Sequence, residues 1–385
     1  MKPKTNSDTT TKLYIGLDVH KEQTSVAVAD PGPQGEVRSH GSIMTCLPSI
    51  EKLLRRLAKT KGIALSEIHV CYEAGGCGMW IARALKKLKV QCTVIAPSLI
   101  PSKPGDQVKT DKKDAIKLVR LLRAGELTAV HVPDEADEAI RDLCRARVDA
   151  VDDLRRAKSR LSGLLRRLGH RYVGAATWSE AHMRYLRDLK MPYPSHSFIL
   201  EEIIQQIGEL QERIARIEDQ MELQCADWSR KPLVEAIMAL RGFQIIAAMM
   251  VVSEIGDFVR FNHPKQLMSY LGLTPGEYSS GGKQKQGAIT KCGNSHLRWL
   301  MVECATHYRL EPKVSVNLSK RQEGQPRWIK DISWKAQNRL NARYKTLQKR
   351  LMHYNKIKVS IARELTGVIW EIGFKMQSIP TPDAK

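Results

Sequence analysis

The hydrophobic pattern of the chain changes its period near residue 139, and this change constrains the fold more than any other feature. Before residue 100, apolar residues fall in short runs or alternate in steps of two, as in 13–18 and 24–30. This is the pattern of β-strands. From about residue 139 they recur in steps of three and four, which is the pattern of long helices. A chain of 385 residues has room for two or three domains, so we predict an α/β domain followed by a mainly helical region.

The order of elements in the first part is specific. We predict three consecutive strands at 13–18, 24–30 and 36–42, joined by short turns. Strands and helices then alternate, with helices expected at 47–58, 79–88 and 111–124 and strands at 68–73 and 90–96. Three strands in a meander followed by strand–helix alternation is the order of a ribonuclease-H-like domain of the α/β class.

Two long amphipathic segments follow. The first runs from about residue 140 to residue 168, with one polar break in its apolar stripe. The second keeps apolar residues at the a and d positions of three heptads, at Leu200, Ile203, Ile207, Leu210, Ile214, Ile217 and Met221. A stretch with Trp178, Pro192 and Pro194 separates them, so we predict a helical hairpin. It is either a spacer within one chain or a coiled coil that joins two chains; heptads alone leave both open, and we expect a dimer.

The charge of the chain indicates its class of partner. Lys and Arg number 62 against 41 Asp and Glu, which gives a net charge of +21. An excess of this size is typical of proteins that bind polyanions. The alternative is charge that only keeps the protein soluble, but here the cations are clustered. Because the sequence shows no basic amphipathic membrane helix and no lipidation signal, nucleic acid is favoured over a membrane surface.

Several classes of protein are disfavoured by what the sequence lacks. No run of eighteen apolar residues is present, so we expect no membrane span. The eight cysteines are scattered without a Cys-x-x-Cys pair, which disfavours a disulfide scaffold and a thiolate zinc site. Residues 1–10 are polar and do not resemble a secretory signal. We therefore expect a disordered tail at 1–10 and a protein of the reducing cytoplasm.

A basic stretch near the C-terminus is a candidate nucleic-acid surface. Residues 320–358 contain twelve Lys or Arg against two acids, and Trp328, Trp334 and Tyr344 are interleaved with them. Cations suit phosphates, and aromatic rings suit bases or sugars. The alternative is a solvated helix that packs through its aromatics, and we favour nucleic acid over it. The expected nucleic-acid contacts, including cations further upstream, are Lys283, Lys285, Lys291, Arg298, Arg327, Lys330, Lys335 and Arg339.

Four acids lie at the ends of predicted elements. Asp18 and Glu73 each end a strand, and Asp111 and Asp114 begin a helix on one shared face. If the strands are neighbours, the four carboxylates converge beyond the sheet. Carboxylates at close range repel unless a cation lies between them, and oxygen ligands suit Mg²⁺. The alternatives are a turn residue at Asp18, and a helix cap with a first-turn acid at Asp111 and Asp114.

A polar, glycine-rich segment at 274–294 is long for a loop inside a helical domain, and such loops are usually functional or disordered. It contains Tyr278-Ser279-Ser280-Gly281-Gly282-Lys283. A serine among glycines and cations can attack a phosphate while the cations hold its oxygens. The Gly-Gly-Lys sequence lacks the spacing of a Walker loop. On the local sequence alone, Ser279 and Ser280 are better explained as turn residues before Gly281.

Four segments together resemble one known family. They are Ile15-Gly16-Leu17-Asp18-Val19-His20-Lys21, Tyr72-Glu73-Ala74-Gly75-Gly76, Lys109-Thr110-Asp111-Lys112-Lys113-Asp114-Ala115, and the stretch from Leu271-Gly272-Leu273-Thr274-Pro275 to Ile289-Thr290-Lys291-Cys292-Gly293-Asn294. They look like the DEDD transposases of insertion sequences, the insertion-sequence-one-hundred-and-ten family, which includes the Piv-type DNA invertases. The resemblance runs from about residue 13 to residue 309. It departs at Thr290, where Ser is common, and in the long basic tail after residue 310.

The resemblance implies a fold in three parts. They are a RuvC-like (ribonuclease-H-like) domain at 1–135, a coiled-coil insertion at 136–228, and a mainly helical transposase domain at 229–377, with a tail at 378–385. The resemblance also implies that Asp18, Glu73, Asp111 and Asp114 bind Mg²⁺. It maps the family's serine nucleophile to Ser280, with Ser279 directly adjacent.

The function that the resemblance implies is site-specific DNA recombination at a composite site. Ser280 attacks the DNA phosphate to form a phosphoserine link, and a structured bridge RNA pairs with donor and target DNA. The protein acts as a homo-oligomer, a dimer or a tetramer on DNA, at the nucleoid. Three rivals stay open: an invertase that needs no guide, a RuvC-like nuclease that cuts branched DNA with Mg²⁺ and water, and a nucleic-acid-binding scaffold with a decayed site.

Overall fold

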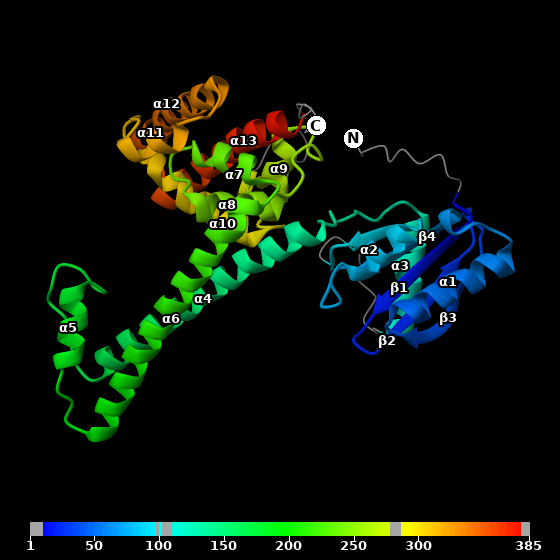
Figure 1. Ribbon diagram of the computed structural model, residues 1–385, viewed down its shortest axis with the longest axis horizontal. Helices are drawn as coiled ribbons and strands as arrows, with labels where there is room; N and C mark the ends of the chain where they lie inside the picture. Colours follow the sequence, from blue (N-terminus) through cyan, green and yellow to red (C-terminus); the bar gives the residue numbers. More distant parts are fainter. Residues whose placement is uncertain (1–10, 98–99, 102–109, 278–285, 379–385) are drawn as a thin grey trace. The chain divides into compact units, whose positions relative to one another are not determined.

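The computed structural model of the protein describes residues 11–97, 100–101, 110–277 and 286–378. The chain forms two compact units, 1–133 and 134–385 (Figure 1). Each unit has its own hydrophobic core. The second unit contains both the long helical hairpin and the C-terminal helices. The sequence assigns these to separate domains, and that division stays a prediction.

The first unit is built on one mixed five-stranded sheet. Its strands are β1 (Leu13–Val19), β2 (Gln23–Ala29), β3 (Val37–Met44), β4 (Ile68–Glu73) and β5 (Gln91–Ile95). They lie in the spatial order β3-β2-β1-β4-β5. β1 pairs antiparallel with β2 and parallel with β4, and β5 continues parallel to β4. This is the ribonuclease-H-like order predicted from the sequence, and each strand lies within about two residues of its predicted bounds.

Helices cover both faces of this sheet. They are α1 (Leu47–Lys61), α2 (Trp80–Lys87) and α3 (Asp111–Arg123), and a short 3₁₀ turn, η1 (Leu65–Glu67), precedes β4. Side chains alternate along each strand, so Ile15 and Leu17 of β1 pack with α1 and α2 on one face. On the other face, Ala115 and Val119 of α3 pack against the alanines of β2. The apolar runs of the sequence are therefore strands that are buried on both sides.

The second unit begins with a helical hairpin. Its helices are α4 (Glu135–Arg167), α5 (Glu180–Asp188) and α6 (Pro194–Asp227). α4 and α6 lie side by side, and α5 lies near the turn between them (Figure 1). Asp134 and Ser179 cap α4 and α5, because each side chain accepts a backbone hydrogen bond from the first turn. The predicted hairpin is confirmed; that it is a coiled coil stays a prediction.

The rest of the second unit is a set of helices around one core. Its elements are α7 (Lys231–Met238), α8 (Ile245–Ile255), α9 (Pro264–Tyr270), β6 (Pro275–Glu277), β7 (Gln286–Ile289), α10 (Ser295–Ala305), η3 (Thr306–Arg309), α11 (Val316–Gln322), α12 (Arg327–Lys349) and α13 (Tyr354–Ser378). α8 is buried along most of its length, which explains its nearly continuous apolar sequence. None of the helices that the structure describes is long and apolar enough to cross a membrane.

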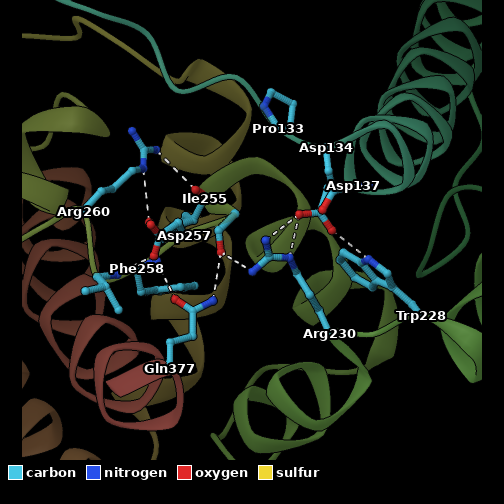
Figure 2. A network of polar contacts seen from close by, with 12 residues as sticks. Pro133, Asp134, Asp137, Trp228, Arg230, Ile255, Asp257, Phe258, Arg260 and Gln377 are labelled. Carbon is cyan, nitrogen blue, oxygen red and sulfur yellow. Dashed lines mark hydrogen bonds and ion pairs between the residues drawn. The ribbon is translucent and has the colours of Figure 1, made fainter. Parts of the chain in front are cut away.

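A buried polar network connects the start of α4 to these helices (Figure 2). Asp137 of α4 accepts hydrogen bonds from Arg230 Nε at 2.6 Å and from Trp228 Nε1 at 2.9 Å. Arg230 also donates to the carbonyl oxygen of Gly256 at 2.9 Å, and Gln377 of α13 donates to the same oxygen at 3.1 Å. Because the buried carboxylate is fully paired, the network fixes the base of the hairpin relative to both α8 and α13.

Candidate active site

Two of the four predicted acids lie at the ends of neighbouring strands. Asp18 is near the end of β1 and Glu73 is the last residue of β4. The strands run parallel, with Leu17 opposite Tyr72. Leu17 and Tyr72 both face the core formed with α1 and α2. Since side chains alternate, Asp18 and Glu73 both point to the face of the sheet that carries α3.

The first turn of α3 carries the other two acids. Its N-cap is Thr110, whose hydroxyl accepts a hydrogen bond from the backbone N–H of Lys113. The alternative interpretation of Asp111 as the helix cap is therefore wrong. Asp111 and Asp114 are first-turn acids, where the helix dipole stabilises their charge. They are thus free to act as ligands rather than as caps.

Gly16 of β1 allows α3 to lie very close to the sheet. A Cβ at this position would be 2.5 Å from the carbonyl oxygen of Ala115 and 2.8 Å from the backbone nitrogen of Val119. Both are backbone atoms of α3, so any larger residue would push the helix away. The close approach lies two residues before Asp18 in the strand, and it sets the distance from that carboxylate to the first turn of α3.

Asp18, His20 and Asp111 form a tight cluster of candidate metal ligands. Nε2 of His20 lies 3.2 Å from Oδ2 of Asp18 and 3.6 Å from Oδ1 of Asp111. One ligand atom from each of the three residues lies within 4.8 Å of the others. Glu73 and Asp114, although described, are not part of this tight group. The structure therefore brings two of the four predicted acids into ligand distance. Asp114 follows one helical turn after Asp111, and Glu73 ends the strand that pairs with β1.

The electrostatics of the cluster fit a cation. Partial burial raises the pKa of Asp18 above its ordinary value, the adjacent His20 opposes this rise, and the negative charges of Asp111 and Asp114 add to it. Carboxylates that raise one another's pKa are stabilised when a cation binds between them. Carboxylate oxygens are the ligands that Mg²⁺ prefers. The residues present therefore fit the divalent metal that the sequence predicted.

His20 is a site residue that the sequence reasoning missed. It stands two residues after Asp18, in the short connection between β1 and β2. The only sequence feature that could have pointed to His20 is that it stands close to Asp18, a predicted metal ligand. The fold shows that its ring reaches both Asp18 and Asp111. An imidazole there can hold the two carboxylates in place or act as a further ligand.

The predicted nucleophile Ser280, its neighbour Ser279 and the cations Lys283 and Lys285 lie in 278–285, outside the described residues. The structure describes the two strands that flank this segment. β6 and β7 pair antiparallel, and their facing ends bound the segment on both sides. Glu277 and Gln286, the described residues on either side of it, face each other in this pair of strands.

The connection from β7 to α10 is held by a buried carboxylate. The side chain of Glu254, in α8, is 3% exposed and accepts hydrogen bonds from Arg145 at 2.7 and 3.0 Å and from Asn294 Nδ2 at 2.7 Å. Asn294 also caps α10, because its Oδ1 accepts from Leu297 N at 2.9 Å. Burial would raise the pKa of Glu254, but the bonds from Arg145 and Asn294 and the charge of Arg145 hold it below its ordinary value. Its only sequence signal was one acid inside an apolar helix.

Two of the predicted nucleic-acid contacts follow the segment around β7. Lys291 is exposed. Arg298 is engaged within the fold, because its guanidinium donates to the carbonyl oxygens of Leu271 at 3.0 Å and Cys292 at 3.3 Å. These bonds support the turn around β6 and β7. They leave Lys291 as the more accessible of the two cations.

The other four predicted contacts that the structure describes all lie on α12. Arg327, Lys330, Lys335 and Arg339 are exposed, on the side of the helix away from the core. Arg339 pairs with Glu364 of α13 at 3.1 Å, so part of its charge is neutralised. The exposed face of α12 is thus a basic surface, as the sequence predicted.

Comparison with known proteins shows which family the chain resembles. A transposase family model of the DEDD type matches residues 15–170, and the model described as Transposase IS116/IS110/IS902 family matches residues 234–315. The chain is 41% identical over 361 residues to the putative transposase y4qE of Sinorhizobium fredii, covering 94% of this chain and 88% of the relative. It is 27% identical over 340 residues to the transposase for insertion sequence element IS1533 of Leptospira borgpetersenii, covering 88% and 97%.

The two matched segments include the acids of the first unit and the helices that surround β6 and β7. The alignments extend along most of both chains, so the likeness concerns the whole protein and not a single motif. The chain therefore belongs to the IS116/IS110/IS902 family and is an insertion-sequence transposase, an enzyme that cleaves and moves DNA.

Proposed function

We propose that this transposase is a site-specific recombinase that cleaves and rejoins DNA at a Mg²⁺ site formed by Asp18, Glu73, Asp111 and Asp114. The observation that carries the proposal is the position of these acids. Asp18 and Asp111 lie in one tight cluster, and the charge of Asp114 acts on the carboxyl of Asp18. Glu73 ends the strand that runs parallel beside Asp18.

In this proposal the metal is held by side chains on a sheet and on a helix packed against it. Asp18 and Glu73 come from the sheet, and Asp111 and Asp114 come from a helix that the contact at Gly16 holds against it. Ligands on rigid elements keep their geometry better than ligands on loops. When bound, the ion supplies Lewis-acid stabilisation of the charge that develops on a phosphodiester.

We propose Ser280 as the nucleophile. Its hydroxyl gives up its proton as Oγ forms a bond to phosphorus. The bond from phosphorus to one deoxyribose oxygen breaks, and the departing strand end takes up a proton, so none is gained or lost overall. The phosphoserine link keeps the energy of the phosphodiester, so attack by a strand end reverses the exchange and rejoins the DNA. A serine hydroxyl needs a base or a metal to react near neutral pH. No histidine–carboxylate pair adjoins Ser280 in the sequence, which favours help from the acidic site.

A structured bridge RNA that pairs with donor and target DNA is the proposed guide. The net charge of +21 and the basic face of α12 support a large nucleic-acid load. The protein would act as a homo-oligomer, a dimer or a tetramer on DNA, at the nucleoid. Sequencing the RNA that remains bound to the purified protein tests the guide. One defined, stoichiometric RNA supports it, and a random mixture of cellular RNA favours an invertase without a guide.

A rival of another enzyme class is a RuvC-like nuclease that uses only the carboxylates and water on branched DNA. It leaves hydrolysed strand ends and no covalent link to the protein. Replacement of Ser280 would then have no effect on cleavage. The product ends therefore separate the two mechanisms.

Strand cleavage by matched variants tests the acidic site. Asp18→Asn and Glu73→Gln remove metal ligands while keeping side-chain size, so cleavage should fall to background with nucleic-acid binding intact. Asp30→Asn is the control, because Asp30 follows β2 at the opposite end of the sheet and pairs with Lys61 at 2.7 Å. Cleavage by Asp18→Asn or Glu73→Gln at the rate of the Asp30→Asn variant would refute the assignment.

A further inference from the structure

Helix α12 has one face in the core and one face in solvent. Ile329, Ile332, Leu340 and Leu347 are buried, with other residues on the same face. The solvent face carries almost only polar and positively charged side chains. This is the pattern of a surface helix, and a large apolar side chain on the solvent face is an exception to it.

Trp334 is that exception. Its exposed fraction is 47%, although it stands in the middle of the helix. The other two aromatics of this basic stretch have different roles: Tyr344 is buried in the core, and Trp328 is half-buried, with Lys375 5.8 Å from its ring centre. Of the three aromatics that the sequence placed among the cations, Trp334 is thus the one whose ring is available.

The cations nearest to Trp334 along the helix are not neutralised. Lys330 stands four residues before it and so shares its face, and Lys335 follows it directly. Among the described residues neither lysine forms an ion pair. Further along α12 the charges are partly paired, as in the contact of Arg343 with Glu364 at 3.4 Å. Asp331, which stands between Lys330 and Trp334, pairs with Arg327 at 4.0 Å. The two lysines therefore leave a net positive charge near the indole.

We propose that Trp334 stacks on an unpaired base of single-stranded nucleic acid, with the flanking phosphates on Lys330 and Lys335. The inference rests on the proposed function, because it assigns part of the nucleic-acid load to this surface. An aromatic face beside free cations is what a single strand binds, since stacking and phosphate contacts act together. A duplex offers the cations only phosphates, because its bases are already stacked on one another.

Binding of short oligonucleotides to the full-length protein tests the proposal. The ligands are a single-stranded dT₁₂, a U₁₂ and a 20-base-pair duplex, each measured over a range of salt. Trp334→Ala should weaken binding of both single strands about 5- to 140-fold, the range expected for loss of one base–aromatic stack. The duplex affinity and the salt slope should stay unchanged. Trp334→Phe, which keeps an aromatic face, should retain most of the affinity.

Two controls separate stacking from charge and from folding. Trp299→Ala removes an indole of similar exposure on α10 and should leave single-strand binding unchanged. Lys330→Ala with Lys335→Ala should weaken binding of both single strands and duplex. The salt slope should fall by about 0.7 per cation for the single strands and about 0.9 per cation for the duplex. Because about half of the Trp334 side chain is exposed, the thermal midpoint of Trp334→Ala should stay close to that of the parent protein.

Equal single-strand affinity of Trp334→Ala and the parent overturns the proposal. Equal losses for single strands and duplex also overturn it, since they would show a general role of the helix. A change in oligomer mass with unchanged oligonucleotide binding would show that the indole contacts another protein chain instead. The binding measurements need no cleavage, so they test this inference separately from the proposed function. If the protein did not cut DNA but its single-strand binding depended on Trp334, the proposed function would be refuted and this inference would stand.

Discussion

At the residue scale, Gly16 determines how α3 meets the sheet. A methyl group there would meet two backbone atoms of α3 at less than 3 Å. Gly16→Ala should therefore displace the helix and cost about 1–3 kcal/mol of unfolding free energy. The displacement moves Asp111 and Asp114 away from Asp18, so cleavage should fall more than stability alone explains. Denaturant unfolding and a cleavage assay on the same preparation measure both effects.

The control for this prediction is Gly163→Ala near the C-terminal end of α4. Nothing lies within 4 Å of an added Cβ at Gly163. Alanine should therefore raise stability there by about 0.5–1 kcal/mol, because it favours the helix. A Gly16→Ala protein as stable and as active as the parent would show that α3 does not depend on this contact.

Glu254 makes stability depend on acid pH. The folded protein holds its pKa below the ordinary value of 4.5, so its carboxylate stabilises the fold fully above about pH 4.5. That contribution is lost as the pH falls through the folded pKa. Glu254→Gln should cost about 1.5–3 kcal/mol at pH 7, the value of hydrogen bonds to a charged group. The difference from the parent should shrink below pH 4.5, as measured by chemical unfolding at several pH values.

An exposed acid provides the comparison for Glu254. Glu212→Gln removes a carboxylate whose side chain is highly exposed and whose contact with Arg216 is 3.9 Å long. Exposed ion pairs of this kind contribute little to the free energy of unfolding. The unfolding curves of Glu212→Gln should therefore match those of the parent at every pH. A Glu254→Gln protein that behaves like Glu212→Gln would mean that Asn294 and Arg145 do not depend on Glu254.

At the element scale, the hairpin shows which heptad residues of α6 are buried by packing within one chain. Ile207 is buried against α4, together with Leu200, so a charge at Ile207 should unfold the hairpin rather than test assembly. Phe198, by contrast, is 64% exposed on the same helix. If chains associate through the hairpin, Phe198→Lys should lower the oligomer mass in light scattering without changing the thermal midpoint.

Val316→Lys is the matched control for Phe198→Lys, because it places the same charge at an exposed apolar position on α11. Its oligomer mass should equal that of the parent. If Phe198→Lys also leaves the mass unchanged, Phe198 does not join chains, which favours a hairpin that is an internal spacer.

Long periodic elements were predictable from the sequence, and short ones were not. The five strands of the first unit follow from runs of five to eight residues with clear turn signals. α5 was missed because it lies inside a stretch with prolines and aromatics, which indicated a connection. β6 and β7 were missed because three and four residues cannot show a period. In the region of β6 and β7 the sequence indicated only a long polar loop.

At the scale of the whole molecule, acids at strand ends were predictable because a parallel pair of strands brings them to the same end of a sheet. Asp18 and Glu73 follow this rule. His20 and Glu254 do not, because each has a partner far away along the chain, Asp111 for His20 and Arg145 for Glu254. The roles of Ser280 and of the guide come from resemblance and stay proposals. The net charge of +21 fits the DNA substrate of the family to which the chain belongs.

The most direct test of the account is a denaturing gel of the protein after incubation with its substrate DNA and Mg²⁺. The parent should yield a covalent protein–DNA species that protease removes. Ser280→Ala should bind DNA and yield none, because the attacking oxygen is gone, and Asp18→Asn should yield none, because the acidic site is incomplete. A species that persists in Ser280→Ala and disappears in Ser279→Ala moves the nucleophile by one residue. A species that persists in both serine variants, or one that forms in Asp18→Asn at the parental yield, contradicts the account.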